Sequence, residues 1–276
     1  MNRSLGVALS LLALAVVLAG CNAPASGTPA STLTPAPVPE ANASTDRLAA
    51  GELAPGVEAS GVTDTTRLAR AHAEVLAASG YTVDQTVVRT DLNGTLDARY
   101  VTHARFAADA GSFDATLTQT DLVDGTRTTR TVERFGDGQQ VYEAVTESNE
   151  TRYRVVRRPD GRPRSPAVFY PTNLTNEPAI AQLFSLVETT TTDRWTENGT
   201  RYVHVQSVQR FSLPRFQNVT LDATVAESGL VSDYRVAYDV VRDGVTIHVV
   251  VAVTYTDVGE TSPERPGWLD RVNATA

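Results

Sequence analysis

Lysine is absent from this 276-residue chain, so all 24 of its permanently positive side chains are arginine. Aspartate and glutamate together number 32, which gives a formal net charge of −8. This acidic balance argues against a nucleic-acid partner, because phosphate binding needs clustered positive charge. The one local arginine run, between residues 152 and 164, is read as a solvated strand edge and loop, with contact to anionic lipid headgroups as the alternative.

Cysteine is nearly absent as well, and its one occurrence, Cys21, excludes an intramolecular disulfide. Met1–Arg3 supplies one positive side chain, and Ser4–Leu18 is then almost wholly apolar. This run is shorter than the roughly 20 residues that a membrane-spanning helix needs. A positive start followed by a short apolar run is typical of a secretory signal peptide, which we assign to residues 1–20.

The four residues Leu18-Ala19-Gly20-Cys21 resemble the lipobox of prokaryotic lipoproteins. The resemblance implies cleavage before Cys21 and attachment of lipid to its thiol. One hydrocarbon chain anchors a protein only marginally, so a two-chain lipid is expected. We therefore expect the chain to be held by Cys21 on the extracytoplasmic face of a cell membrane.

Residues 21–59 are rich in proline, alanine, serine and threonine and poor in large apolar side chains. Such a composition cannot bury enough surface to fold and predicts a semi-extended tether. The remaining residues, 60–276, are enough for one folded domain with a single core.

Asparagine occurs in Asn-X-Ser/Thr far more often than chance allows. Outside the signal peptide, the candidate N-glycosylation sites are Asn42, Asn93, Asn149, Asn173, Asn198, Asn218 and Asn273. All fall in the tether, in expected turns or near expected strand ends, where a glycan can be tolerated. The alternative is simply threonine-rich strand sequence next to asparagine turns.

The domain begins with a helical pattern that Thr63 or Asp64 can cap and Gly80 can end. Leu68, His72 and Leu76 share its apolar face, so His72 is interpreted as a core histidine.

From Tyr81 onward the hydrophobic period changes to two, and Asn-Gly, Asp-Gly and similar turns separate short alternating runs. Asn176 and Pro178 mark the start of a second helix, after which alternating runs resume. The run from Val245 to Tyr255 is the most apolar and is expected at the centre of the sheet. The prediction is an α+β fold: a long, curled antiparallel sheet, forming an open half-barrel, with an N-terminal helix and a helical insertion.

This order of elements is similar to the LolA/LolB-like fold and to the mycobacterial lipoprotein carriers of the LppX and LprG type. The domain also resembles an uncharacterised family of haloarchaeal lipoproteins with a histidine in the first helix and a Tyr-Thr-X-X-Gly ending, here Tyr255, Thr256 and Gly259. The resemblance implies a half-barrel that holds acyl chains. With the acidic, lysine-free composition it implies a halophilic archaeon as the source, with a high-GC bacterium as the alternative.

Motifs for catalysis are missing from the sequence. The four histidines are scattered without metal-ligand spacing, and no GxSxG, P-loop or GxGxxG occurs. We therefore expect no enzyme, no cofactor and no metal site, although a hydrolase with a site formed only by folding stays open.

Two functions remain. The first is a lipoprotein whose curled sheet binds a lipid or another hydrophobic ligand. The second is a structural or partner-binding envelope protein with a filled core, whose protein partners the sequence does not indicate. An open apolar cleft on the inner face of the sheet would favour the first.

Overall fold

The computed structural model describes residues 51–108, 111–123, 125–166, 176–210, 212, 216–242 and 244–273. The contacts between residues divide the chain into two compact units, Met1–Arg47 and Leu48–Ala276. The second unit contains all of the described residues. Among the described residues, no helix is both long enough and apolar enough to cross a membrane.

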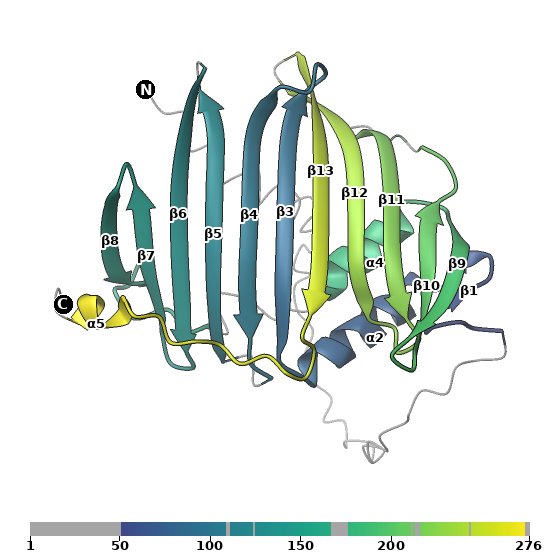
Figure 1. Ribbon diagram of the computed structural model, residues 1–276, viewed down its shortest axis with the longest axis horizontal. Helices are drawn as coiled ribbons and strands as arrows, with labels where there is room; N and C mark the ends of the chain where they lie inside the picture. Colours follow the sequence, from purple (N-terminus) through teal and green to yellow (C-terminus); the bar gives the residue numbers. More distant parts are fainter. Residues whose placement is uncertain are drawn as a thin grey trace, which may run out of the picture. The chain divides into compact units, whose positions relative to one another are not determined.

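Eleven strands form one antiparallel sheet in the order β8-β7-β6-β5-β4-β3-β13-β12-β11-β10-β9 (Figure 1). The strands are β3 (Tyr81–Asp91), β4 (Leu96–Phe106), β5 (Ser112–Val123), β6 (Thr126–Asp137), β7 (Val141–Glu147), β8 (Glu150–Val155), β9 (Thr189–Glu197), β10 (Thr200–Ser207), β11 (Gln217–Ala226), β12 (Val231–Arg242) and β13 (Val245–Thr256). Most of these neighbours are joined by short turns, which allow only antiparallel pairing. The predicted fold class, a long antiparallel sheet with an N-terminal helix and a helical insertion, is confirmed.

Two meanders meet at the middle of the sheet. Strands β3 to β8 advance outward to one edge, and β9 to β13 advance inward from the other edge. They are joined where β13 pairs with β3, for example with Val251 opposite Val87. This pairing places the most apolar strand near the centre, as the sequence predicts.

Three described helices accompany the sheet: α2 (Thr65–Ala77), α4 (Glu177–Ser185) and α5 (Leu269–Asn273). Asp64 caps α2 by accepting a hydrogen bond from the Arg67 backbone N–H at 2.9 Å. The expectation that Gly80 ends this helix is wrong, because Ala78 is its C-cap. Gly80 has a different role: a Cβ there would lie 2.4 Å from the backbone oxygen of Thr261.

Asn176 precedes α4 as predicted, but its side chain does not cap the helix. The residue adopts a left-handed conformation with φ 58°, and its Nδ2 donates to the Tyr255 hydroxyl at 3.3 Å. Pro178 lies in the first turn of the helix, where its missing N–H costs nothing.

Side chains alternate between two faces of the sheet, and the register defines each face. The inner face carries the odd-numbered residues of β13 and β3 and the even-numbered residues of β4. Helices α2 and α4 pack on it through Leu68, Ile180 and Phe184. In Figure 1 both helices lie behind β11 to β13, on the β9 side of the sheet's middle. The opposite side is the outer face.

The tether assigned to residues 21–59 ends earlier than predicted, because its last residues pack into the domain. Ala54 and Val57 are 0% exposed and belong to the core, and Val57–Glu58 (β1) pairs with Gly61–Val62 (β2). Because this stretch contains proline and glycine, its overall composition did not reveal that Ala54 and Val57 are core residues.

Candidate functional site

The inner face of β3, β4 and β5 combines buried side chains, such as Tyr100 and Phe113, with partly exposed ones. Val83, Val87 and Leu117 lie on it and keep part of their surface exposed. Polar side chains such as Gln85 and Thr102 are interspersed among them. The partly exposed side chains can therefore contact an apolar molecule while polar groups lie next to them.

Three tyrosines and a histidine lie in the core beneath the helices. Burial raises the pKa of Tyr255 to about 12 and raises the pKa of Tyr81 and Tyr234 further, so all three stay neutral. His72 is 0% exposed, accepts a hydrogen bond at Nδ1 from the Val231 N–H at 3.1 Å, and meets the Tyr255 ring edge-on at 4.9 Å. The interpretation of His72 as a core histidine is confirmed.

The other three histidines each pair with an aspartate on the outer face. The distances are 2.8 Å for His103–Asp84, 2.9 Å for His204–Asp222 and 2.7 Å for His248–Asp239. The pairs belong to three different pairs of strands. Within the described ranges, no three or more histidine, cysteine, aspartate or glutamate side chains are arranged to hold a metal ion.

A buried carboxylate with two guanidinium partners occupies the inner face near the β8 edge. The Glu143 side chain is 4% exposed and contacts Arg134 at 2.9 Å and Arg154 at 2.5 Å. Burial alone would raise the pKa of Glu143, but the two arginines outweigh it and hold that pKa below its ordinary value. Arg152 and Arg154 of the arginine run lie on edge strand β8, and Arg157, Arg158, Arg162 and Arg164 follow in a loop, which agrees with the reading of that run as a strand edge and loop.

The segment from Asp257 to Asn273, here called the C-terminal strap, crosses the outer face at one end of the strands (Figure 1). Gly259 N–H donates to Gly80 O at 2.8 Å, and the hydroxyls of Thr261 and Thr82 lie 3.0 Å apart. Glu264 N–H then donates to Asp114 at 2.9 Å. The strap thus runs from β3 across β5 toward the far edge.

A second, small core fixes the end of the strap. Leu269 and Val272 of α5 pack with Tyr142, and the Trp268 ring stacks on Tyr153 at a centroid distance of 6.1 Å. Sequence reasoning noted this closing segment but did not place it on the outer face. The signal was present in Trp268, Leu269 and Val272, an apolar group separated from the last strand by a polar, proline-containing stretch.

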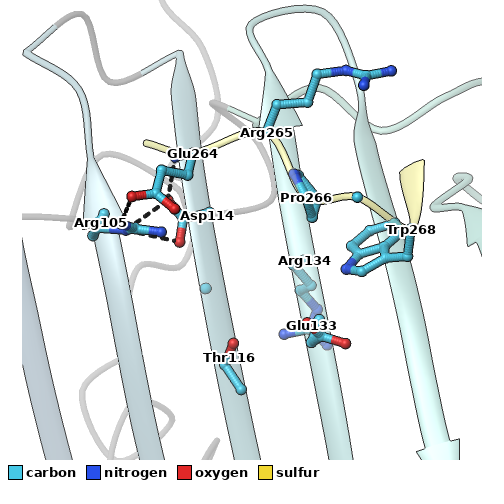
Figure 2. A pocket seen from close by; sticks show the side chains of 11 residues that line it. Arg105, Asp114, Thr116, Glu133, Arg134, Glu264, Arg265, Pro266 and Trp268 are labelled. Atoms are coloured by element: carbon cyan, nitrogen blue, oxygen red, sulfur yellow. Dashed lines mark hydrogen bonds and ion pairs between the residues drawn. The ribbon is translucent and has the colours of Figure 1, made fainter. Parts of the chain in front are cut away.

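A polar cavity of about 330 Å³ lies on the outer face, between the strap and the ends of β4, β5 and β6 that the strap crosses. We call it the strap pocket; Figure 2 shows the side chains that line it. The sheet contributes Arg105, Asp114, Thr116, Glu133 and Arg134, and the strap contributes Glu264 to Trp268.

Ion pairs hold one wall of the strap pocket. Arg105 contacts Asp114 at 3.0 Å and Glu264 at 2.8 Å, and hydrogen bonds to Glu264 and Asp114 raise the pKa of Arg105. At the other wall, the Trp268 Nε1 atom is buried, and none of the described residues accepts its hydrogen. A buried donor without a protein acceptor is rare and needs a physical explanation.

The predicted glycosylation sites fall into groups. Asn93, Asn149 and Asn198 are exposed in hairpin turns, as predicted. Asn218 is also exposed, but its Nδ2 donates to Asp239 at 2.7 Å. Asn273 ends α5. Cys21, Asn42 and Asn173 lie outside the described residues.

Comparison with known proteins gives only distant structural similarity. No protein-family model matches the chain, and no curated protein matches it. A DUF1329-family protein from Desulfovibrio piger shares 11% identity at a TM-score of 0.25, over 71% of this chain and 93% of its own. A LolA-superfamily protein from Nitrosomonas europaea shares 8% sequence identity at a TM-score of 0.25, over 74% of this chain and 95% of its own. The matching chain in the MucA/MucB complex of Pseudomonas aeruginosa shares 11% sequence identity at a TM-score of 0.23, over 75% of this chain and 96% of its own. Scores this low carry no argument about function, which must come from the residues described above.

Proposed function

We propose that this chain is a lipid-anchored protein of the extracytoplasmic face of a cell membrane that binds a lipid or another hydrophobic ligand and catalyses no reaction. The N-terminal apolar run and the lipobox-like residues before Cys21 support the anchor. The inner face of the sheet is the proposed ligand surface. The proposed tether, ending near Leu53, would keep that surface close to the membrane from which the ligand comes.

The observation that carries this proposal is the partial exposure of Val83, Val87 and Leu117 on the inner face. The apolar residues of β11 to β13 are buried in the core with α2 and α4, whereas Val83 and Val87 pack at the margin of that core and, like Leu117, keep part of their surface exposed. Apolar surface that a fold leaves accessible on a concave side gains free energy when an apolar ligand covers it, at about 25 cal/mol per Å².

Two neighbouring residues offer a matched test, because Leu117 faces inward and Thr118 faces outward on the same strand. The full chain and its Leu117→Glu and Thr118→Glu variants would be purified from the source membranes and analysed by native mass spectrometry. Organic extraction separates a non-covalent lipid from one bound to Cys21, because the covalent lipid stays with the protein. We expect an extractable lipid with the parent chain and with Thr118→Glu, and its loss with Leu117→Glu.

The alternative function is a structural or partner-binding envelope protein without a ligand cavity. It is favoured by the dense packing beneath the helices, where Leu68 and Ile180 are 0% exposed and Phe184 is 3% exposed. Absence of any extractable lipid from all three proteins would favour this function and reject ligand binding.

A further inference from the structure

Strand β8 is one edge of the sheet and has a strand partner on one side only. Its residues pair with β7, and no other described strand lies against them. The backbone N–H and C=O groups on the open side are therefore available to a further strand. Edges of this kind are where extended segments of other proteins add to a sheet through main-chain hydrogen bonds.

The charge of this edge is opposite to that of the chain as a whole. Residues 150–164 contain six of the 24 arginines and only two acids, Glu150 and Asp160, whereas the net charge of the chain is −8. Asp160 is engaged in its own turn, where its carboxylate accepts the Arg162 backbone N–H at 3.0 Å. The edge is thus a positive surface on an acidic protein, and it attracts negatively charged partners.

Most arginines of this edge are accessible. The Arg152 side chain is 84% exposed, and its ion pair with the exposed Glu150 is long, at 3.6 Å. Arg154 is also mostly exposed, although its guanidinium contacts the buried Glu143. Three further arginines are exposed in the loop after β8, and none of the described acids pairs with them: Arg157, Arg158 and Arg162. These side chains can therefore meet a partner without first breaking a strong ion pair.

The alternation of side chains along β8 determines the pattern that a partner needs. Arg152 and Arg154 point to the inner face, whereas Thr151 and Tyr153 point to the outer face, where Tyr153 contacts α5 through Arg271. A strand added beside β8 would place every second side chain on the inner face, with Cβ atoms about 5 Å from those of the arginines. Carboxylates at alternate positions of that strand would meet the guanidinium groups.

A second copy of this chain is a poor partner for the same edge. Pairing β8 with β8 would bring two positive edges together, and like charges placed opposite each other destabilise strand pairing. Charged side chains on an edge strand are a common protection against such self-association. The same arginines leave the edge open to a segment of opposite charge, so they discriminate between partners.

We propose that the edge of β8 binds an extended acidic segment of a partner protein as an additional strand. Its carboxylates would lie on Arg152 and Arg154 and beside the arginines of the following loop. Main-chain hydrogen bonds would supply affinity for any extended segment, and the arginines would select an acidic one. This interaction does not depend on ligand binding by β3 to β5, because β6 and β7 separate that surface from β8.

The probe is a fluorescent synthetic peptide of alternating threonine and glutamate, long enough to span β8, titrated with the full chain in a neutral detergent. One comparison peptide has glutamine in place of glutamate. The other keeps every charge but carries a methyl group on each backbone nitrogen, so it cannot donate main-chain hydrogen bonds. Fluorescence anisotropy measures binding, and infrared spectroscopy of ¹³C-labelled peptide carbonyls detects strand formation.

At about 0.1 M salt, we expect saturable binding of the acidic peptide with a dissociation constant of about 100 μM and a β-strand amide band from the bound peptide. Both comparison peptides should bind at least roughly tenfold more weakly. Arg152→Glu and Arg158→Glu should each weaken binding of the acidic peptide roughly tenfold, because each replaces an attraction with a repulsion. Arg235→Glu, at an exposed position on the outer face of β12, should leave it unchanged.

No binding of the acidic peptide would overturn the proposal. Equal binding of the N-methylated peptide would do the same, because it would show charge attraction without strand addition. Equal binding by Arg152→Glu and Arg158→Glu would place the peptide elsewhere and reject this edge. If the Cys21→Ser chain bound phosphatidylglycerol vesicles through Arg152 but did not bind the peptide, the edge would belong to a membrane surface instead. Far-ultraviolet circular dichroism of each variant distinguishes lost binding from lost folding.

Discussion

Replacing Glu143 with glutamine should destabilise the domain through loss of one buried negative charge. Its carboxylate is 4% exposed and pairs with Arg134 at 2.9 Å and with Arg154 at 2.5 Å. Glutamine keeps the shape of the side chain, but its NH₂ group replaces one of the two oxygens and cannot accept from the arginine that it faces. Its amide oxygen still accepts from the other arginine, without the negative charge. The guanidinium charges are then left beside an uncharged partner.

The exposure of the two arginines sets the size of the effect. Arg134 is 26% exposed, so its loss of a charged hydrogen bond is worth about 1.5–2 kcal/mol. Arg154 is 65% exposed and can turn to water, which limits its share to about 0.5–1 kcal/mol. The sum, about 2–3 kcal/mol, should lower the melting temperature of a domain of this size by roughly 5–10 °C.

The pH dependence of the same variant provides a second check. The folded pKa of Glu143 is below its ordinary value of 4.5. Its stabilising contribution is therefore complete above pH 4.5 and is lost as the pH falls through the depressed folded value. Consequently the parent chain should lose more stability in acid than Glu143→Gln does.

Urea denaturation followed by circular dichroism measures both effects. Glu147→Gln, on the same strand but exposed, is the matched control and should stay within about 0.5 kcal/mol of the parent. A Glu143→Gln variant as stable as this control at pH 7 would refute the argument.

Three further changes have defined outcomes. Gly80→Ala places a Cβ 2.4 Å from the Thr261 backbone oxygen and should cost about 1–3 kcal/mol in urea denaturation, whereas Gly267→Ala, with no atom within 4 Å, should be neutral. Cys21→Ser should move the protein from the membrane fraction to the soluble fraction, and persistence in the membrane would contradict a lipid anchor. Asn198→Gln should speed migration in gel electrophoresis when the chain comes from its own host. Asn218→Gln should not, because the Asn218 amide is bound to Asp239.

Local patterns were enough to predict most of the elements from the sequence. Alternating side chains and turn residues such as Asn198-Gly199 define the strands, since both depend only on neighbouring residues. The centre of the sheet could also be predicted, because Val245 to Tyr255 is apolar on nearly every inward position.

Contacts between distant parts of the chain could not be predicted in the same way. The partners of Glu143 lie on two other strands and depend on the register of both pairings. The strap pocket requires Trp268 to cross the outer face and approach Glu133, and no local pattern encodes that path. The tether boundary failed for the opposite reason, since composition averaged over the segment concealed the single core residues Ala54 and Val57.

The most direct test of ligand binding on the inner face uses Val87 and Val88, adjacent partly buried residues of β3 that face opposite sides of the sheet. Because Cys21 is the only cysteine, Cys21→Ser combined with either Val87→Cys or Val88→Cys accepts a polarity-sensitive dye at one position. The labelled proteins would be titrated with lipid extracted from the source membranes. Binding on the inner face predicts a saturable blue shift of the dye at position 87 and none at position 88. No shift at either position, or equal shifts at both, would contradict it.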